Sequence, residues 1–137
     1  MIFVLCLSPN EKIKSIITGG IGGCGKAVAK AILEKGGYVV LFDIVQPEVG
    51  TQIAQEINKD RVLYIQADIT DEDSTKKAVK MASNVFEKKL SGAIHCAGIA
   101  VRQPWSPIVS DSIANFKNAL KVNVSSCVSD LNGFNLT

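Results

Sequence analysis

A glycine-rich segment, residues 19–25, is the feature that most constrains the fold of this chain. The residues before it predict a short buried strand that carries Ile13, Ile16 and Ile17. The residues after it predict a helix whose buried face carries Ala27, Val28, Ala31 and Ile32. Glycines at such a turn let the backbone approach a phosphate, and the helix N-terminus offers unpaired N–H groups. The segment therefore predicts either a phosphate-binding turn or a tight turn with only a structural role.

Further strand-like runs follow along the sequence. A continuous apolar run at residues 38–42 predicts a parallel strand that is covered on both faces. Residues 61–65 and 93–97 predict two more strands. Together with the run before the glycines, these give about four strands.

The segments between these strands show the apolar repeat of helices. One helix is expected to carry Val49, Ile53 and Ile57. Another opens with Thr70 and Asp73 as a capping box and runs to Phe86. A last helix is expected to carry Phe116, Leu120 and Asn123 on one side. Because strands that alternate with helices form βαβ units, we expect an α/β fold with a Rossmann-like parallel sheet and helices on both faces.

The length and composition suit one domain with a core of its own. The chain has 137 residues, of which 47% are hydrophobic. Residues 1–10 and 125–137 fall outside the alternation of strands and helices. We expect a single domain over residues 1–137 with weakly ordered ends.

Charge and cysteine content exclude several classes of protein. With a net charge of +2 and no basic run longer than a lysine pair, the chain has no electrostatic footprint for nucleic acid. The apolar run at residues 2–7 is too short to span a bilayer and lacks the flanks of a signal peptide. The four cysteines form no C-x-x-C pair and His95 is the one histidine, so no metal site is expected. We expect reduced thiols and a cytoplasmic location, with the mitochondrion left open.

Two phosphate-binding patterns overlap in the glycine-rich segment. Gly20, Gly25 and Lys26 satisfy G-x-x-x-x-G-K, which opens the phosphate loop of nucleotide hydrolases. The next residue, Ala27, has no hydroxyl group to bind Mg²⁺. Asp43 ends the second predicted strand, where a carboxylate can accept hydrogen bonds from an adenosine ribose. That carboxylate favours a dinucleotide over a nucleoside triphosphate.

With these residues in place, the chain resembles the short-chain dehydrogenase/reductase family over roughly residues 12–124. Five motifs carry the resemblance: a T-G-x-x-x-G-x-G loop at Thr18, Gly19, Gly23 and Gly25, an acidic strand end at Asp43, an Asp-hydrophobic pair at Asp68 and Ile69, the Asn-Asn-Ala-Gly position at His95, Cys96, Ala97 and Gly98, and a helix asparagine at Asn123. Residues 96–100 further resemble the type-2 3-hydroxyacyl-CoA dehydrogenase branch.

The resemblance implies a single partial dinucleotide-binding domain over residues 1–137, with strand order 3-2-1-4 and a sheet that is incomplete at one edge. It also implies a nicotinamide dinucleotide as cofactor. The residues that it implies in cofactor binding are Thr18, Gly19, Gly23, Cys24, Gly25, Asp43, Ile44, Asp68, Ile69, Cys96, Ala97 and Gly98. Asp43 would repel the 2′-phosphate of NADP, and neither Cys24 nor Ile44 supplies a basic partner for it, so NAD is favoured. Asp68 has an alternative interpretation, as a cap of the helix that starts near Asp71. His95 is expected to pack and not to catalyse.

The chemistry of this family needs a tyrosine and a lysine spaced as Y-x-x-x-K, and the sequence contains no such pair. Tyr38 and Tyr64 are followed four residues later by Phe42 and Asp68. Of the family's catalytic set, only Asn123 has a counterpart here. The resemblance therefore implies the cofactor-binding half of an oxidoreductase, truncated and inactive alone, that would move hydride between NAD and an alcohol or carbonyl. The alternative is a non-catalytic NAD-binding or interaction module.

The same reasoning gives the expected partners. A small-molecule substrate is expected only where a full-length chain completes the site. A second copy of the chain is expected to associate through the helices, and neither nucleic acid nor a membrane is expected.

Overall fold

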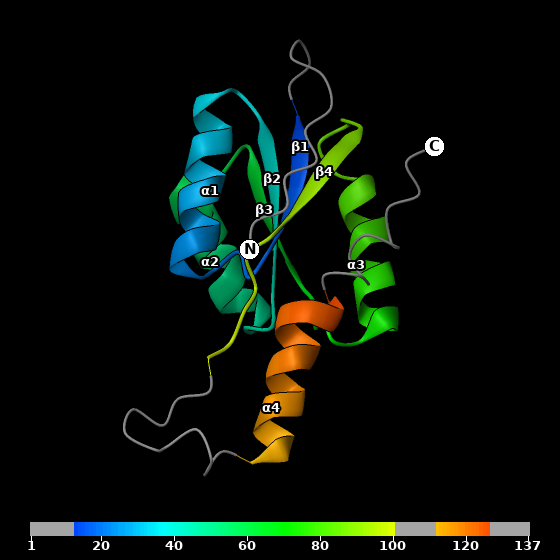
Figure 1. Cartoon of the computed structure of the whole chain (residues 1–137). Helices are drawn as coiled ribbons and strands as arrows, with labels where there is room; N and C mark the ends of the chain where they lie inside the picture. Colours follow the sequence, from blue (N-terminus) through cyan, green and yellow to red (C-terminus); the bar gives the residue numbers. More distant parts are fainter. Residues whose placement is uncertain (1–12, 101–111, 127–137) are drawn as a thin grey trace.

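The apolar runs of the sequence form one parallel sheet. The computed structural model describes residues 13–100 and 112–126. The strands are β1 (Lys14–Thr18), β2 (Tyr38–Asp43), β3 (Val62–Gln66) and β4 (Leu90–His95). They lie in the order β3-β2-β1-β4, and every pair is parallel (Figure 1). Within the described ranges β4 pairs with β1 alone, so the predicted Rossmann-like fold, its strand order and its open edge are confirmed.

Helices cover both faces of this sheet, and each face has its own core. On one side lie α1 (Gly23–Glu34) and α2 (Pro47–Asn58), and on the other lies α3 (Glu72–Ser83) (Figure 1). The first core contains Ile17, Ala29, Ile32, Val39, Leu41, Ala54, Val62 and Ile94. The second contains Ile16, Val40, Phe42, Ala67, Ala78, Val79 and Ala82. Because neighbouring residues of a strand point to opposite faces, β1 and β2 contribute to both cores.

The buried face of α1 differs from the prediction. Ala27 and Ala31 are exposed, and the buried positions are Gly25, Ala29 and Ile32. The helix rests on the preceding turn through Gly25, so its buried stripe continues from there at steps of four and three residues. The prediction was wrong for the two alanines, whereas Ile32 is buried and Val28 packs against the first core. Apolar periodicity does not show where a helix touches the turn before it.

The buried face of α2 differs for a related reason. Gly50 and Ala54 are its buried residues, whereas Val49 is 51% exposed. The ring of Tyr64 in β3 lies against Gly50, where a Cβ atom would overlap it. The helix therefore turns its small residues, and not Val49, toward the sheet.

The start and end of α3 also need correction. Its N-cap is Asp71, whose carboxylate accepts a hydrogen bond from the Ser74 N–H at 3.0 Å. Thr70 was expected there, but its hydroxyl donates to Asp68 instead. The helix ends at Ser83, before Phe86, whose positive φ of 62° is incompatible with a right-handed helix.

The fourth strand ends two residues earlier than expected. It runs from Leu90 to His95 and pairs with β1, whose last residue, Thr18, lies opposite His95. The Cys96 N–H makes the last backbone hydrogen bond to β1, at the Thr18 carbonyl oxygen, and because β1 ends there, Cys96 and Ala97 leave the sheet. Both residues are thereby available to line a site at the sheet's end.

The last described helix lies beyond the sheet. α4 (Ile113–Leu120) continues as a π-helical segment, η2 (Lys121–Ser125), at the end where β1 leads into α1 (Figure 1). No residue of α4 is buried, and Ile113 and Phe116 are 73% and 60% exposed. The helical conformation extends to residue 126, which lies within the tail expected to be weakly ordered. Residues 1–12 and 127–137 lie outside the described residues. They include all other residues of the two ends that the sequence predicts to be weakly ordered.

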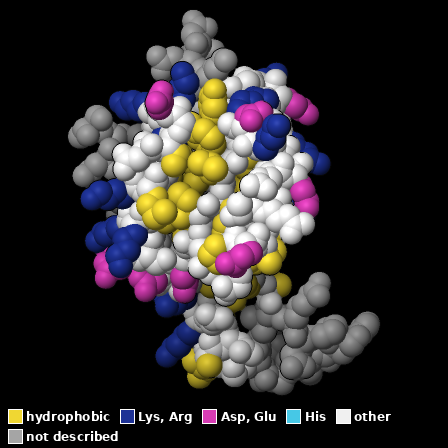
Figure 2. All heavy atoms as spheres, turned by 180° about the vertical axis from the view of Figure 1, so that it is seen from behind, with side chains coloured by type: hydrophobic (Ala, Val, Ile, Leu, Met, Phe, Trp, Pro, Cys, Tyr) yellow, Lys and Arg dark blue, Asp and Glu magenta, His cyan; other side chains and the backbone are white. Residues whose placement is uncertain are grey.

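The surface combines charged and apolar groups. Seen from behind, it shows a band of apolar side chains with basic and acidic side chains interspersed around it (Figure 2). The strand β3 forms the second edge of the sheet, and its Leu63 is exposed. In the part of the chain that the structure describes, no helix has both the length and the apolar character needed to cross a bilayer.

A buried lysine ties β1 to α3. Lys14 is fully buried, and its Nζ donates hydrogen bonds to the carbonyl oxygens of Ala82, Ser83 and Val85, each at 2.9 Å. The last carbonyls of a helix have no partner within it and carry the negative end of its dipole. Burial lowers the pKa of the Lys14 ammonium, whereas the three carbonyl oxygens favour its charged form. The lysine thus adds donors to carbonyl oxygens at the end of α3 and just beyond it.

We predict that Lys14→Met lowers the free energy of unfolding by about 1–3 kcal/mol, because the buried carbonyl oxygens lose their donor while the alkyl chain is kept. The matched control is Lys30→Met at an exposed position of α1, which should change it by less than about 0.5 kcal/mol. Urea unfolding followed by circular dichroism measures both. Equal effects of the two variants would contradict the capping role.

Candidate functional site

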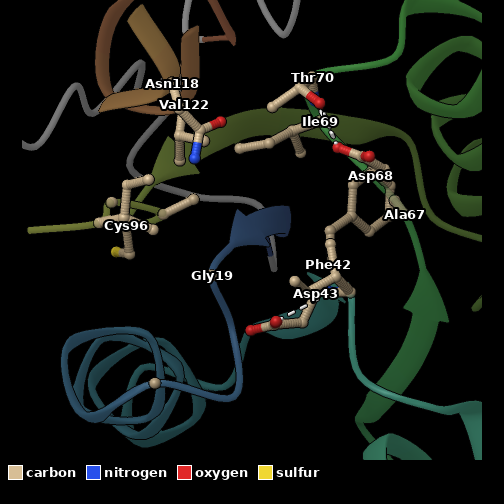
Figure 3. Close-up of a pocket in the computed structure, with 15 residues that line it drawn as sticks. Gly19, Phe42, Asp43, Ala67, Asp68, Ile69, Thr70, Cys96, Asn118 and Val122 are labelled. Carbon is tan, nitrogen blue, oxygen red and sulfur yellow. Dashed lines mark hydrogen bonds between the residues drawn. The ribbon is translucent and has the colours of Figure 1, made fainter. Parts of the chain in front are cut away.

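A cleft of about 420 Å³ lies at the carboxyl ends of the strands. Its walls come from the β1–α1 turn, from the ends of β2, β3 and β4, and from α4 with η2 (Figure 3). The lining residues are Gly19, Gly22, Phe42, Asp43, Ile44, Ala67, Asp68, Ile69, Thr70, Cys96, Ala97, Gly98, Ile99, Asn118 and Val122. In open parallel sheets ligands bind at this end, where the strand order reverses. The cleft is therefore the candidate site.

Most of the cofactor-binding residues expected from the sequence meet in this cleft. Those in its lining are Gly19, Asp43, Ile44, Asp68, Ile69, Cys96, Ala97 and Gly98. The others are Thr18, at the end of β1, and Gly23, Cys24 and Gly25, in the first turn of α1. Tertiary folding thus brings together residues that come from four separate segments of the chain.

The β1–α1 turn is packed too tightly for side chains. Gly19 has a φ of +63°, and a Cβ atom on it would lie 2.6 Å from the Cα of Ala97. A Cβ atom on Gly25 would overlap the carbonyl oxygen of Gly19. Gly23, in contrast, is exposed and has no atom within 4 Å of such a position. The glycines therefore differ in role: two permit close packing, and Gly23 leaves the start of α1 open.

Thr18 lies beneath the turn and braces the sheet. A hydrogen bond of 2.9 Å joins its hydroxyl to Nδ1 of His95, and both residues are buried. The Cys96 N–H donates to the Thr18 carbonyl oxygen at 3.0 Å. The geometry gives Thr18 and His95 a packing role, linking β1 to β4 at the floor of the site.

The Asp43 carboxylate stands at the end of β2 and faces the glycine turn (Figure 3). Its Oδ2 accepts a hydrogen bond from the Ile21 N–H at 3.1 Å, and its Oδ1 accepts one from the Ile44 N–H at 2.8 Å. Each carboxylate oxygen has a second lone pair with which it can accept a further hydrogen bond. The carboxylate is thus held in place at the rim of the cleft and retains acceptor capacity for a ligand.

A second carboxylate, Asp68, follows β3. Its Oδ1 accepts from the Thr70 hydroxyl at 2.7 Å and from the Thr70 N–H at 2.9 Å. Both hydrogen bonds lower the pKa of Asp68 below its usual value, and the bond from the Thr70 hydroxyl has the larger effect. The positive charge of Lys121 acts in the same direction. The alternative interpretation of Asp68 as the cap of α3 is wrong, because Asp71 caps that helix. Asp68 is instead an ionised acceptor in the cleft.

The segment after β4 forms the opposite wall. The pKa of the Cys96 thiol is raised, mainly by burial, so the thiol is protonated at neutral pH. The next lining residues, Ala97 and Gly98, are small and leave the backbone accessible. This wall therefore offers main-chain groups and not charges.

Asn123 fixes that wall from η2. Its Oδ1 accepts from the Ile99 N–H at 2.8 Å, and its Nδ2 donates to the Ile99 carbonyl oxygen at 2.9 Å. Asn123, expected from the sequence to be catalytic, lies outside the cleft lining and holds the backbone of Ile99. Single π-helical turns occur frequently at functional sites.

Sequence reasoning missed the residues that close the cleft from α4 and η2. Asn118 and Val122 lie four residues apart, so they share one face of the helical segment and both line the cleft (Figure 3). The sequence predicts only a buried strand position for Phe42 and a helix cap for Thr70, and it singles out no role for Ala67. No motif marks these positions, because their role depends on how the helix is placed across the sheet.

The sequence matches the family model of the short chain dehydrogenases over residues 14–133. The chain belongs to this family. Membership implies oxidoreductase ancestry and a nicotinamide cofactor, NAD(H) or NADP(H).

Curated relatives and solved structures agree with that membership. The chain is 38% identical over 87 residues to an NAD-dependent glycerol dehydrogenase of Listeria innocua, covering 64% of this chain and 33% of that protein. It is 34% identical over 112 residues to secoisolariciresinol dehydrogenase of Forsythia intermedia (81% and 39%) and 28% identical over 112 residues to 3-hydroxyacyl-CoA dehydrogenase type-2 of Drosophila melanogaster (80% and 43%). A short-chain type dehydrogenase/reductase of Mycobacterium ulcerans superposes with a TM-score of 0.76 at 26% identity, covering 90% of this chain and 45% of that one. The chain thus spans less than half the length of these relatives.

We predict a large effect on stability at one glycine of this turn and a small one at another, two residues away. Gly25→Ala should lower the free energy of unfolding by about 1–3 kcal/mol, because its Cβ atom meets backbone that cannot move aside. Gly23→Ala should change it by less than about 0.5 kcal/mol, since its Cβ atom enters open space. Urea unfolding compares the two, and a Gly25→Ala variant as stable as the parent would contradict the packing described here.

Proposed function

We propose that the cleft binds NAD and that the chain is the cofactor-binding part of an oxidoreductase acting on an alcohol or carbonyl group. The observation that carries the proposal is the Asp43 carboxylate, held at the rim of the cleft beside the glycine turn. A carboxylate at the end of the second strand suits the two hydroxyl groups of an adenosine ribose.

The remaining walls suit the other parts of such a cofactor. The N-cap of α1, Gly22, makes no side-chain hydrogen bond to the first turn, so the N–H groups there can meet a pyrophosphate. Asp68 and Ile69 would hold the adenine, where the carboxylate can accept from the amino group. The segment from Cys96 to Ile99 would lie along the nicotinamide half. Thr18 would support this site from below, while Gly23 and Cys24 would face the phosphates and Gly25 would keep the turn closed.

Charge favours NAD over NADP. The 2′-phosphate of NADP would lie near the Asp43 carboxylate and be repelled by it. None of the residues that line the described cleft is a lysine or an arginine, so no cation there offsets this repulsion.

The hydride chemistry of the family would be supplied by the bound nicotinamide. Of the family's catalytic residues this chain contributes Asn123, whose side chain orients the backbone of Ile99. The 137-residue sequence contains no Y-x-x-x-K pair and spans 33 to 43% of three curated relatives. We therefore propose that proton transfer requires residues from outside this sequence. The missing pair equally supports a second candidate, a non-catalytic NAD-binding or interaction module.

The proposal also covers partners and location. The exposed apolar residues Ile113, Phe116 and Val124 on α4 and η2 suit contact with a second copy of the chain. The substrate would be a small molecule, such as a 3-hydroxyacyl-CoA, and the compartment the cytoplasm.

Asp43→Ala should weaken NAD binding about ten- to a hundredfold, because a charge-assisted hydrogen bond to the ribose is lost. Isothermal titration calorimetry with NAD and NADP measures the effect, and the parent should bind NAD more tightly than NADP. Equal NAD affinities of parent and variant would mean that Asp43 does not contact the cofactor.

The 137-residue chain alone should form no NADH from NAD with a 3-hydroxyacyl-CoA or a simple secondary alcohol. The reason is that its sequence supplies no tyrosine–lysine pair for proton transfer. Absorbance at 340 nm measures the product, with boiled protein as the control. Turnover above that control would overturn the claim of inactivity.

A further inference from the structure

Tyr64 supports the turn that carries Asp43, although it lies outside the cleft lining. Its hydroxyl oxygen is 2.6 Å from the Val45 carbonyl oxygen and 2.9 Å from that of Asp43, so its single proton is shared between the two acceptors. Its ring lies against Gly50 of α2, at a distance that leaves no room for a Cβ atom. One side chain from β3 therefore spans the turn between β2 and α2.

Side chains from β3 support the carbonyl groups of this turn at and beyond the last hydrogen bond between β2 and the chain leaving β3. The Asp43 carbonyl oxygen also accepts from the Ala67 N–H at 2.9 Å, and that of Ile44 accepts from Gln66 Nε2 at 3.2 Å. The Gln66 side chain is exposed, whereas Tyr64 is packed between β3 and α2. Of the two side chains that hold the turn, Tyr64 is thus less exposed to solvent than Gln66. Its contacts reach both ends of the turn.

The same turn supplies a donor to the Asp43 carboxylate. The Ile44 N–H, between the two carbonyls that Tyr64 holds, donates to Asp43 Oδ1 at 2.8 Å. A displacement of the Ile44 peptide would therefore move or release the carboxylate. Preorganised groups bind ligands more tightly because less ordering remains to be done on binding.

The tyrosine stays a donor over the whole physiological range. Burial, in the first place, and then the negative charge of Asp43 raise the pKa of Tyr64 to about 12. The phenol is therefore protonated wherever the protein would bind a cofactor.

We infer that Tyr64 is a positioning residue for the cofactor: through the Val45 and Asp43 carbonyl groups it holds the Asp43 carboxylate where it meets the ribose. This inference rests on the proposed function, since it takes Asp43 to be the ribose contact. Tyr64 itself touches no cofactor and acts only through Asp43.

A double-mutant cycle tests the inference on the purified chain. Tyr64→Phe keeps the ring and removes the hydroxyl, and it should weaken NAD binding about three- to tenfold by calorimetry. In the Asp43→Ala background the same change should have less than about a twofold effect, because the group through which it acts is gone. Tyr38→Phe, at the other end of β2 where its ring contacts Phe86, is the matched control and should leave the affinity unchanged.

A measurement without cofactor separates positioning from general destabilisation. Tyr64→Phe should speed hydrogen exchange of the Ile44 amide, whose bond to the carboxylate loosens, while Tyr38→Phe should not. Binding is compared at a temperature where thermal melts show every variant folded.

The outcomes distinguish the inference from the proposed function. Normal NAD affinity of Asp43→Ala would overturn both, because Asp43 would then not be the ribose contact. If Asp43→Ala weakens NAD binding but Tyr64→Phe leaves the NAD affinity normal, the positioning role alone is overturned. An equal loss of NAD affinity on Tyr64→Phe in the parent and in the Asp43→Ala background would also overturn the positioning role, since Tyr64 would then not act through Asp43.

Discussion

The close contact between the β1–α1 turn and the chain leaving β4 is the constraint on which the rest of the structure depends. Gly19 lies against the backbone of Ala97, and Gly25 lies against the Gly19 carbonyl oxygen, so neither position can carry a side chain. This contact determines where α1 begins and which of its residues are buried. It also brings the end of β4 to the edge of the cleft.

The polar groups around this contact are held in place by the protein itself. Asp43 is fixed by the N–H groups of Ile21 in the glycine turn and of Ile44 after β2, and Asp68 by both donors of Thr70. Asn123 pairs with both backbone groups of Ile99. Because the protein itself supplies partners for these groups, their positions in the cleft are fixed by the fold.

The sequence was sufficient for the kind and order of the elements. Apolar runs and helical periods predicted four strands and the helices between them, and the glycine turn with Asp43 predicted the site's location. The helix faces were less predictable, because Ala27 and Val49 fit an apolar period yet face solvent. The observed ends of helices and strands differ from the predicted ones where a cap or a neighbouring strand sets the boundary, as at Asp71 and His95.

By itself, then, the sequence determined what depends on local sterics and periodicity: the glycine turn, the parallel alternation and an acidic residue at the end of β2. The tertiary structure alone decided contacts between distant segments. Lys14 at the end of α3, Tyr64 beneath the Asp43 turn, and Asn118 with Val122 across the cleft belong to this group. The physical reason is that local preferences act within a few residues, whereas these contacts depend on how α3, β3 and α4 pack around the sheet.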